Sequence, residues 1–183
     1  MSIRARIEDA MVLFAIGRLE AALLCTLTAV AASSRRRRPI GTPSVLRPGR
    51  AMGDGEAFEA FLKEEMVRIC NVVNFFVQYR GSMHRLEHIF YKWMRCDLAH
   101  EAQLPIDIAF QEDPEPNSFR LEVRSDGVLV LSQGWLDGLA NAVIQAPENS
   151  DQFGSPAMAP ASIYLSKIDV TLRKVPEMGS TSQ

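Results

Sequence analysis

The sequence predicts an α+β protein. A long N-terminal helix or helical hairpin, about residues 56–98, would pack with an antiparallel sheet of about four strands and one further helix, about residues 133–146. Three observations predict this class. Apolar residues recur every three or four positions from residue 58 to residue 97, which is typical of a helix. Residues 106–131 alternate apolar with polar positions around a turn signal, and residues 133–146 carry one apolar helical face.

The helical segment has a start signal but an ambiguous middle. Asp54 is a suitable N-cap, and from Phe58 to Asp97 the apolar spacing averages about 3.5 residues, the repeat of a helix that presents one seam to a partner. Gly81 and Ser82 suit a helix end and a new start, so a helical hairpin turning there is the alternative. The repeat crosses Gly81 without a change of phase, which favours one continuous helix.

A continuous helix of this length has a consequence for assembly. Forty residues span about 60 Å, much more than a domain of this size, whose radius of gyration is near ~14 Å. We therefore expect a non-catalytic interaction or assembly subunit that binds another protein, or its own copy, through the 58–97 helix. The residues expected at this surface lie on the seam: Phe76, Tyr79, Met83, Leu86, Phe90 and Trp93.

One fragment of this segment suggests chemistry instead. On a helix, His84 and His88 share a face with Glu87 beside them, and two imidazoles so placed can bind zinc while the carboxylate polarises a water molecule. The alternative function is therefore a zinc-dependent hydrolase, with His84 and His88 as metal ligands and Glu87 as the catalytic group. The competing interpretation is a polar shoulder beside the apolar seam, with no cofactor.

Residues 81–88 are similar to the pitrilysin-type signature of inverted zinc proteases. The resemblance implies a third, carboxylate ligand well downstream, and residues 149–176 contain no Glu and only Asp151 and Asp169 as candidates. The sequence contains no GxSxG elbow, Walker loop or GxGxxG turn. The sequence therefore favours a protein that is not an enzyme, and zinc is implied only under the alternative function.

Charge is divided unevenly along the chain. Residues 1–50 hold nine Arg against three acids, a charge of +6, and residues 51–183 hold eleven Lys and Arg against nineteen acids, a charge of −8. An acidic body is a poor partner for nucleic acid, whose phosphates require clustered positive charge. Cys25, Cys70 and Cys96 have no metal-binding spacing, and reduced thiols indicate an intracellular, cytoplasmic protein.

Residues 1–51 are expected to form a leader that is disordered, directs targeting or is a spurious extension of the reading frame. The apolar run 21–32 is shorter than the roughly 20 residues of a membrane span, so a membrane-anchored form would depend on residues 11–32 alone. An organelle-targeted form would depend on the Arg-rich leader as a whole. The arginine run 35–38 is expected to be solvated, with a nuclear-localisation or nucleic-acid patch as the alternative.

Residues 52–177 are then a single α+β domain. Asp126-Gly127 predicts a hairpin in which Val123 faces Val130 and Leu121 faces Ser132. Residues 128–131 are apolar on both faces and predict a central strand, and the helix that follows has Trp135 as a core anchor. The remaining expectations are a structureless loop over 147–161, a last strand over 163–172 and a disordered tail over 178–183.

Overall fold

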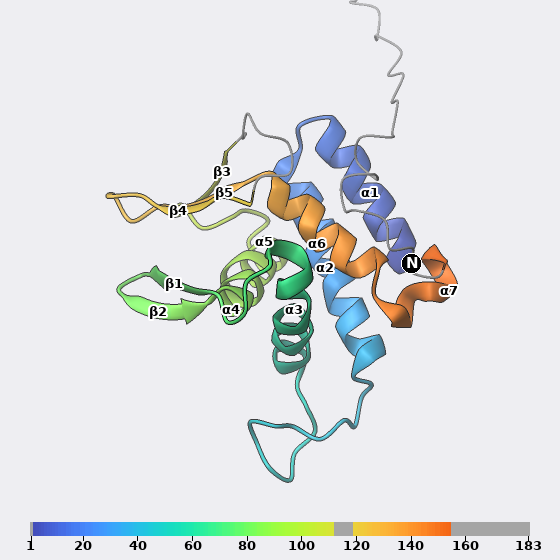
Figure 1. The fold of residues 1–183 in the computed structure, drawn as a ribbon. Coiled ribbons are helices and arrows are strands. Elements are labelled where there is room, and N and C mark those ends of the chain that lie inside the picture. The colour runs from blue at the N-terminus through green and yellow to red at the C-terminus, as the bar shows by residue number, and fades with distance from the viewer. Residues whose placement is uncertain (1, 112–118, 155–183) are drawn as a thin grey trace, which may run out of the picture.

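The structure is a computed structural model that describes residues 2–111 and 119–154. A layer of helices carries two small sheets, of two and three strands, which project from one side of it (Figure 1). The predicted α+β class is confirmed.

The N-terminal segment is a pair of antiparallel helices that belongs to the core. Helix α1 (Ile3–Ala15) and helix α2 (Leu19–Arg37) are joined at Gly17, whose φ of +76° suits a residue without a Cβ. Leu23, Leu27 and Val30 of α2 are fully buried, and α2 contacts α1, α3 and α6. The expectation of a disordered leader is therefore wrong for residues 3–37.

The reason for this error is visible in the composition of α2. Small residues at Ala22, Ala29 and Ser33 are buried beside the aliphatic ones, so neighbouring helices pack closely against α2 on more than one face. A helix that is apolar on much of its circumference belongs in a core. Among the described residues, no helix combines the length and the apolar character that crossing a membrane requires.

The predicted helix over residues 56–98 is wrong in its middle. Helix α3 (Asp54–Cys70) ends at Asn71, which adopts the left-handed conformation with φ of +57°. A hairpin of β1 (Phe76–Tyr79) and β2 (Ser82–Arg85) follows. The chain then returns to helix in α4 (Leu86–Ile89), the π-helical turn η1 (Phe90–Arg95) and α5 (Cys96–His100).

Local preferences explain the hairpin. Residues 72–79 are rich in β-branched and aromatic side chains, which favour strands. Arg80 and Gly81 have φ of +51° and +74°, and two consecutive positive φ values are typical of the type I′ turn that closes a two-residue hairpin. The pairs are Phe76 with Arg85, Val77 with His84, Gln78 with Met83 and Tyr79 with Ser82.

The second sheet contains β3 (Ile108–Gln111), β4 (Leu121–Val123) and β5 (Leu129–Ser132), in the order β3-β5-β4. The predicted sheet of about four antiparallel strands is corrected here, since β3 pairs with β5 in parallel and β4 pairs with it antiparallel. Strand β5 is central and buried at all four positions, as predicted.

The predicted register between β4 and β5 is wrong by one residue. Leu121 pairs with Leu131 and Val123 pairs with Leu129. Arg124 N donates to Val128 O, so the loop is one residue longer than a two-residue turn. Gly127 supplies the positive φ of +85° that three-residue hairpin loops use.

Helix α6 (Gly134–Ile144) follows and confirms the helix predicted for about 133–146. Trp135 is fully buried, as expected of a core anchor. A Cβ at Gly138 would lie 2.7 Å from Ile69 Cγ2 of α3, so glycine permits the close approach of α6 to α3.

Two short helices, η2 (Pro147–Asn149) and α7 (Ser150–Phe153), replace the first part of the loop expected over 147–161. Asn149 is buried, and its side chain donates hydrogen bonds to Ser33 Oγ and Val143 O. The predicted strand over 163–172 and the tail over 178–183 lie outside the described residues.

Candidate functional site

The six residues expected at an interaction surface separate into two groups. Tyr79, Leu86 and Phe90 are at most 1% exposed and lie in the core, and Trp93 is half-buried. Phe76 and Met83 are exposed, by 49% and 61%. The expectation of an interaction surface along a helix over 58–97 is therefore wrong, because residues 76–85 form a hairpin and three of the six seam residues lie in the core.

The exposed pair belongs to the outer face of the β1–β2 hairpin. Opposite residues of an antiparallel pair lie on the same face, so Phe76, Gln78, Met83 and Arg85 share the outer one. Exposed apolar side chains occur here and in the turn before β1, and a second group lies at Ile40, Val45 and Leu46. We call Val72, Val73, Phe76 and Met83 the hairpin patch.

The inner face of the hairpin packs on the π-helical turn. Tyr79 meets the Trp93 ring edge-on with 5.3 Å between ring centroids, and His84 meets it at 4.7 Å. A π-turn widens a helix locally and is often found at functional positions. Here Trp93 comes from that turn, and its contacts with Tyr79 and His84 hold the hairpin on the helical layer.

Arg80 supplies a second anchor at the tip of the hairpin. Its guanidinium donates two hydrogen bonds of 2.7 Å to the two carboxylate oxygens of Asp107, which directly precedes β3. The same guanidinium lies 5.1 Å from the Tyr79 ring centroid. The hydrogen bond from Arg80 lowers the pKa of Asp107, so the pair stays ionised at neutral pH.

The candidate zinc ligands do not share a helix. His84 lies on β2 and His88 on α4, with their rings nearly parallel and 6.0 Å between centroids. His88 Nδ1 lies 2.7 Å from Glu59 Oε1 of α3. Glu87 is buried, with its carboxylate 3.6 Å from Arg85. The predicted i, i+4 placement of both histidines on one helical face is therefore wrong.

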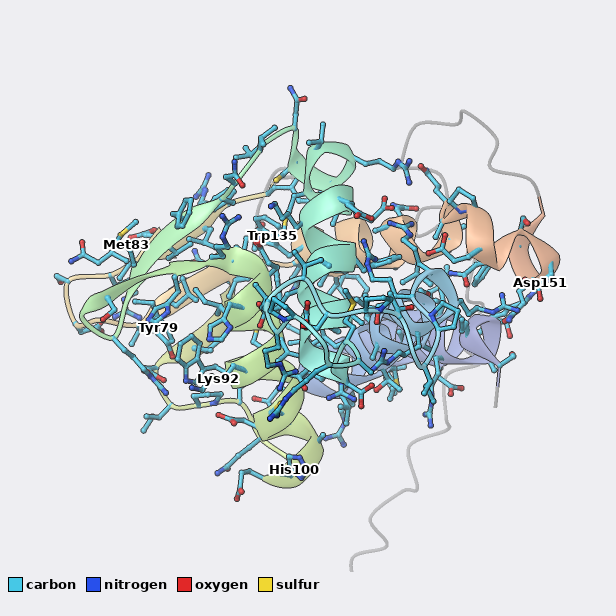
Figure 2. All side chains as sticks on the ribbon, turned by 90° about the horizontal axis from the view of Figure 1, so that it is seen from below. Tyr79, Met83, Lys92, His100, Trp135 and Asp151 are labelled. Atoms are coloured by element: carbon cyan, nitrogen blue, oxygen red, sulfur yellow. The ribbon has the colours of Figure 1, made fainter. Side chains whose placement is uncertain are left out.

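The third ligand implied by the resemblance is not near these histidines in the described part of the chain. Asp151 is bound by Arg36 at the opposite end of the molecule from Tyr79 and Met83 (Figure 2), and Asp169 lies outside the described residues. Within residues 2–111 and 119–154, no group of three or more His, Cys, Asp or Glu side chains is arranged to hold a metal ion.

The arginine run at the end of α2 is engaged in ion pairs within the chain. Arg35 pairs with Asp54 and Arg36 with Asp151, and Arg38 pairs with Glu64. The sequence shows the acids as well as the arginines, but nothing local indicates that they meet. These three arginines are thus ion-paired with acids of the same chain, many residues away in sequence.

Arg37 has the largest number of acidic partners in this run. It binds Glu65 and Glu148 at 2.7 and 2.8 Å and Glu64 at 3.0 Å, and its guanidinium lies 4.3 Å from the Phe61 ring centroid. Burial works to lower the pKa of Arg37, but the hydrogen bonds to Glu148 and Glu65 outweigh it and raise the pKa.

An open hollow of about 380 Å³ lies between the α1–α2 turn and α5. Its lining contains Arg18 and Glu20 as its charged residues and otherwise small or aliphatic side chains, such as Leu24 and Leu98. The described residues of this lining include no nucleophile paired with a base.

The sequence profile of the Rv1289 family matches residues 2–165. The chain belongs to the Rv1289 family. The match to Rv1289 includes α1 and α2, which agrees with their place in the core. No curated protein and no solved structure matches the chain at a significant level. The family name states no activity, so the function of this Rv1289 member is inferred from its geometry.

Proposed function

We propose that this protein is a non-catalytic interaction subunit that binds another protein through the outer face of the β1–β2 hairpin. The observation that carries the proposal is the hairpin patch: Val72, Val73, Phe76 and Met83 are 36–68% exposed within twelve consecutive residues. Clustered exposed apolar side chains mark interaction sites more often than scattered ones do.

The size of the patch suits the centre of an interface. Full burial of one such side chain is worth about 1.5–3 kcal/mol. Since these four side chains are about half exposed, covering them would contribute roughly 3–6 kcal/mol before association costs. That amount is enough for an energetic hot spot, with the rest of the interface supplied by polar contacts around it.

The hairpin is also rigid, which favours binding. Tyr79 and His84 pack on Trp93, and Arg80 is held by both oxygens of Asp107. A surface that is ordered before the partner arrives loses little conformational entropy on binding.

A second exposed apolar surface serves as a control. In the connection between α2 and α3, Val45 and Leu46 are 81% and 74% exposed. The backbone of this loop is already satisfied, because Glu56 accepts hydrogen bonds from Ser44 Oγ, Val45 N and Leu46 N. This loop therefore has exposed aliphatic side chains, as the hairpin patch does, but the backbone N–H groups of Val45 and Leu46 are already hydrogen-bonded.

The experiment compares three tagged forms of the full chain: the wild type, Phe76→Ser/Met83→Ser and Val45→Ser/Leu46→Ser. Proteins that co-purify with each form from the source organism are identified by mass spectrometry. Each candidate is then purified, and its binding is measured by calorimetry. Light scattering of the wild type alone tests whether the partner is a second copy.

We expect a directly binding partner whose affinity falls at least about tenfold in the Phe76→Ser/Met83→Ser form and stays within about twofold in the control. Equal loss in both variants would contradict the proposal, and so would a set of co-purifying proteins of which none binds directly. The same melting temperature in all three forms establishes that the serine substitutions leave the fold intact.

A further inference from the structure

We infer that the partner contributes an extended, acidic segment that pairs as an additional strand with the edge of β2 that no described strand covers. This inference rests on the proposed function and specifies the partner's chemistry. It is carried by the backbone of the hairpin rather than by the apolar patch alone.

The hydrogen-bond pattern identifies which backbone groups point outward. Leu86 N donates to Phe75 O across the base of the hairpin, so these two residues form a hydrogen-bonded pair. Hydrogen-bonded and non-hydrogen-bonded pairs alternate in an antiparallel ladder. The pairs of Phe76 with Arg85 and Gln78 with Met83 are therefore non-bonded, and their N–H and C=O groups face away from the hairpin.

Both edges of this two-stranded sheet are open in the described part of the chain. No third strand pairs with β1 or β2. The outward backbone groups of Phe76, Gln78, Met83 and Arg85 have no hydrogen-bond partner among the described residues. Neither strand contains Pro, a residue that natural edge strands use to prevent pairing. An exposed edge of this kind can accept an extended peptide by strand addition.

The edge of β2 fits a partner of defined chemistry better than the edge of β1. On the outer face of the hairpin, β2 presents the side chains of Met83 and Arg85, whereas β1 presents those of Phe76 and Gln78 and no charge. The Arg85 side chain is 39% exposed and lies over the Phe76 ring, 5.0 Å from its centroid. An incoming strand with an apolar residue beside Met83 and an acid beside Arg85 would satisfy both positions.

Residues 71–85 contain two Arg and no acid, although residues 51–183 as a whole carry a charge of −8. Arg80 is already paired with Asp107, and Arg85 Nη1 lies 2.9 Å from Asn74 Oδ1 and 3.6 Å from Glu87 Oε1. Arg85 Nε and Nη2 have no hydrogen-bond partner among the described residues, so these donors can bind a carboxylate of an incoming strand.

In the neighbouring π-helical turn, Lys92 and Arg95 lie over aromatic rings. Opposite charges across neighbouring strands stabilise pairing, and like charges oppose it. A second copy pairing β2 with β2 would bring its own Arg85 to this edge, so an acidic segment of a different protein is the better occupant.

The probe for this inference is a phage-displayed library of random twelve-residue peptides selected on the full-length protein. We expect enriched peptides to carry Asp or Glu two positions from an aliphatic or aromatic residue. That is the spacing of side chains on one face of a strand. A synthetic peptide with the consensus sequence is then titrated into the wild type and three variants.

Arg85→Glu should weaken peptide binding at least about tenfold. Met83→Pro removes an outward N–H from β2 without removing a bond of the hairpin ladder and should lower binding to the level of an unrelated peptide. The matched control, Gln78→Pro, makes the same change on β1 and should alter binding by less than about twofold. Unchanged melting temperature and tryptophan fluorescence, to which Trp93 and Trp135 both contribute, show that each variant is folded.

A second measurement needs no change in the protein. N-methylation of the consensus peptide at alternate residues should abolish binding when the methylated N–H groups face β2. Methylation at the intervening residues should leave binding intact.

Three results would overturn the inference: no enriched peptide, a consensus without acids, or greater sensitivity to Gln78→Pro than to Met83→Pro. If a co-purified partner still requires Phe76 and Met83, the interaction function stands and only strand addition fails. If the patch variants also bind that partner normally, both proposals fail.

Discussion

Arg37 at the end of α2 donates a hydrogen bond of 2.7 Å to the Glu65 carboxylate of α3, whose side chain is 4% exposed. Arg68 binds the other Glu65 oxygen at 2.6 Å. The Arg37–Glu65 pair joins α2 to α3. Arg37 also binds Glu148, so the same guanidinium joins α2 to η2. Burial of an ionised carboxylate is costly unless it is paired in this way.

Replacement of Glu65 by Ala should destabilise the protein by about 1–3 kcal/mol. Loss of one partner from a buried ion pair costs about 3–5 kcal/mol, and the cost is smaller here because Arg37 keeps Glu64 and Glu148 as partners. Urea unfolding followed by circular dichroism measures the change. Glu8→Ala is the control: its pair with Arg4 is more than half exposed, and it should cost less than about 0.5 kcal/mol.

Leu27→Ala should destabilise the protein by about 2–5 kcal/mol, because Leu27 of α2 is fully buried and its truncation leaves a cavity. Leu46→Ala, at a side chain that is 74% exposed, should change stability by less than about 0.5 kcal/mol. Equal stability of the two variants in urea unfolding would show that α2 is not part of the cooperative fold.

Asp137→Asn should make the protein more stable at neutral pH. Burial raises the pKa of Asp137 from its ordinary value of 3.8 to about 6, and its Oδ1 has no hydrogen-bond partner among the described residues. Because the folded pKa lies above the unfolded one, the wild type loses stability as the pH rises from about 4 to about 6. The variant lacks this loss.

The expected gain for Asp137→Asn is roughly 1–2 kcal/mol at pH 7, after allowance for the partial exposure of the group. At pH 4 the two proteins should be nearly equal in stability. Thermal unfolding at half-unit pH intervals measures the difference between variant and wild type, which removes the contribution of other titrating groups. A difference that does not vary with pH would contradict the assignment.

Zinc should not bind stoichiometrically at His84 and His88. His88 is bound to Glu59, and Glu87 is buried near Arg85. Metal analysis of purified protein and melting with added zinc test this expectation, with His88→Ala as the comparison. Near-stoichiometric zinc that is lost in His88→Ala, without unfolding, would revive the hydrolase alternative and count against a non-catalytic subunit.

Parts of the fold with strong local signals could be predicted from the sequence. Gly134–Ile144 shows an apolar helical face, and β5 is a short run that is apolar at successive positions. The turn at Asp126-Gly127 was predicted, but its register was not, because Ser125 adds a residue to the loop. A single extra residue in a turn moves every side-chain pair, and local sequence does not indicate it.

The error over residues 71–85 has a different origin. A four-residue strand places only two side chains on each face, so the helical spacing of Phe76, Tyr79 and Met83 arose by coincidence. Asn71, Asn74, Arg80 and Gly81 all have positive φ, but among these residue types only glycine is a strong sequence signal for that conformation. The candidate interaction surface is therefore the outer face of the β1–β2 hairpin rather than a helix. Of the six residues predicted for it, Phe76 and Met83 are exposed.

The sequence by itself determined the α+β class, helix α6, the central strand β5 and the acidic charge of residues 51–183. These features depend on neighbours within a few positions along the chain. Only the tertiary structure decided that α1 and α2 belong to the core and that Arg35–Arg38 are paired. It also decided which face of the β1–β2 hairpin remains open. Those outcomes depend on contacts between residues far apart in sequence, where local propensity is overridden by burial and charge pairing.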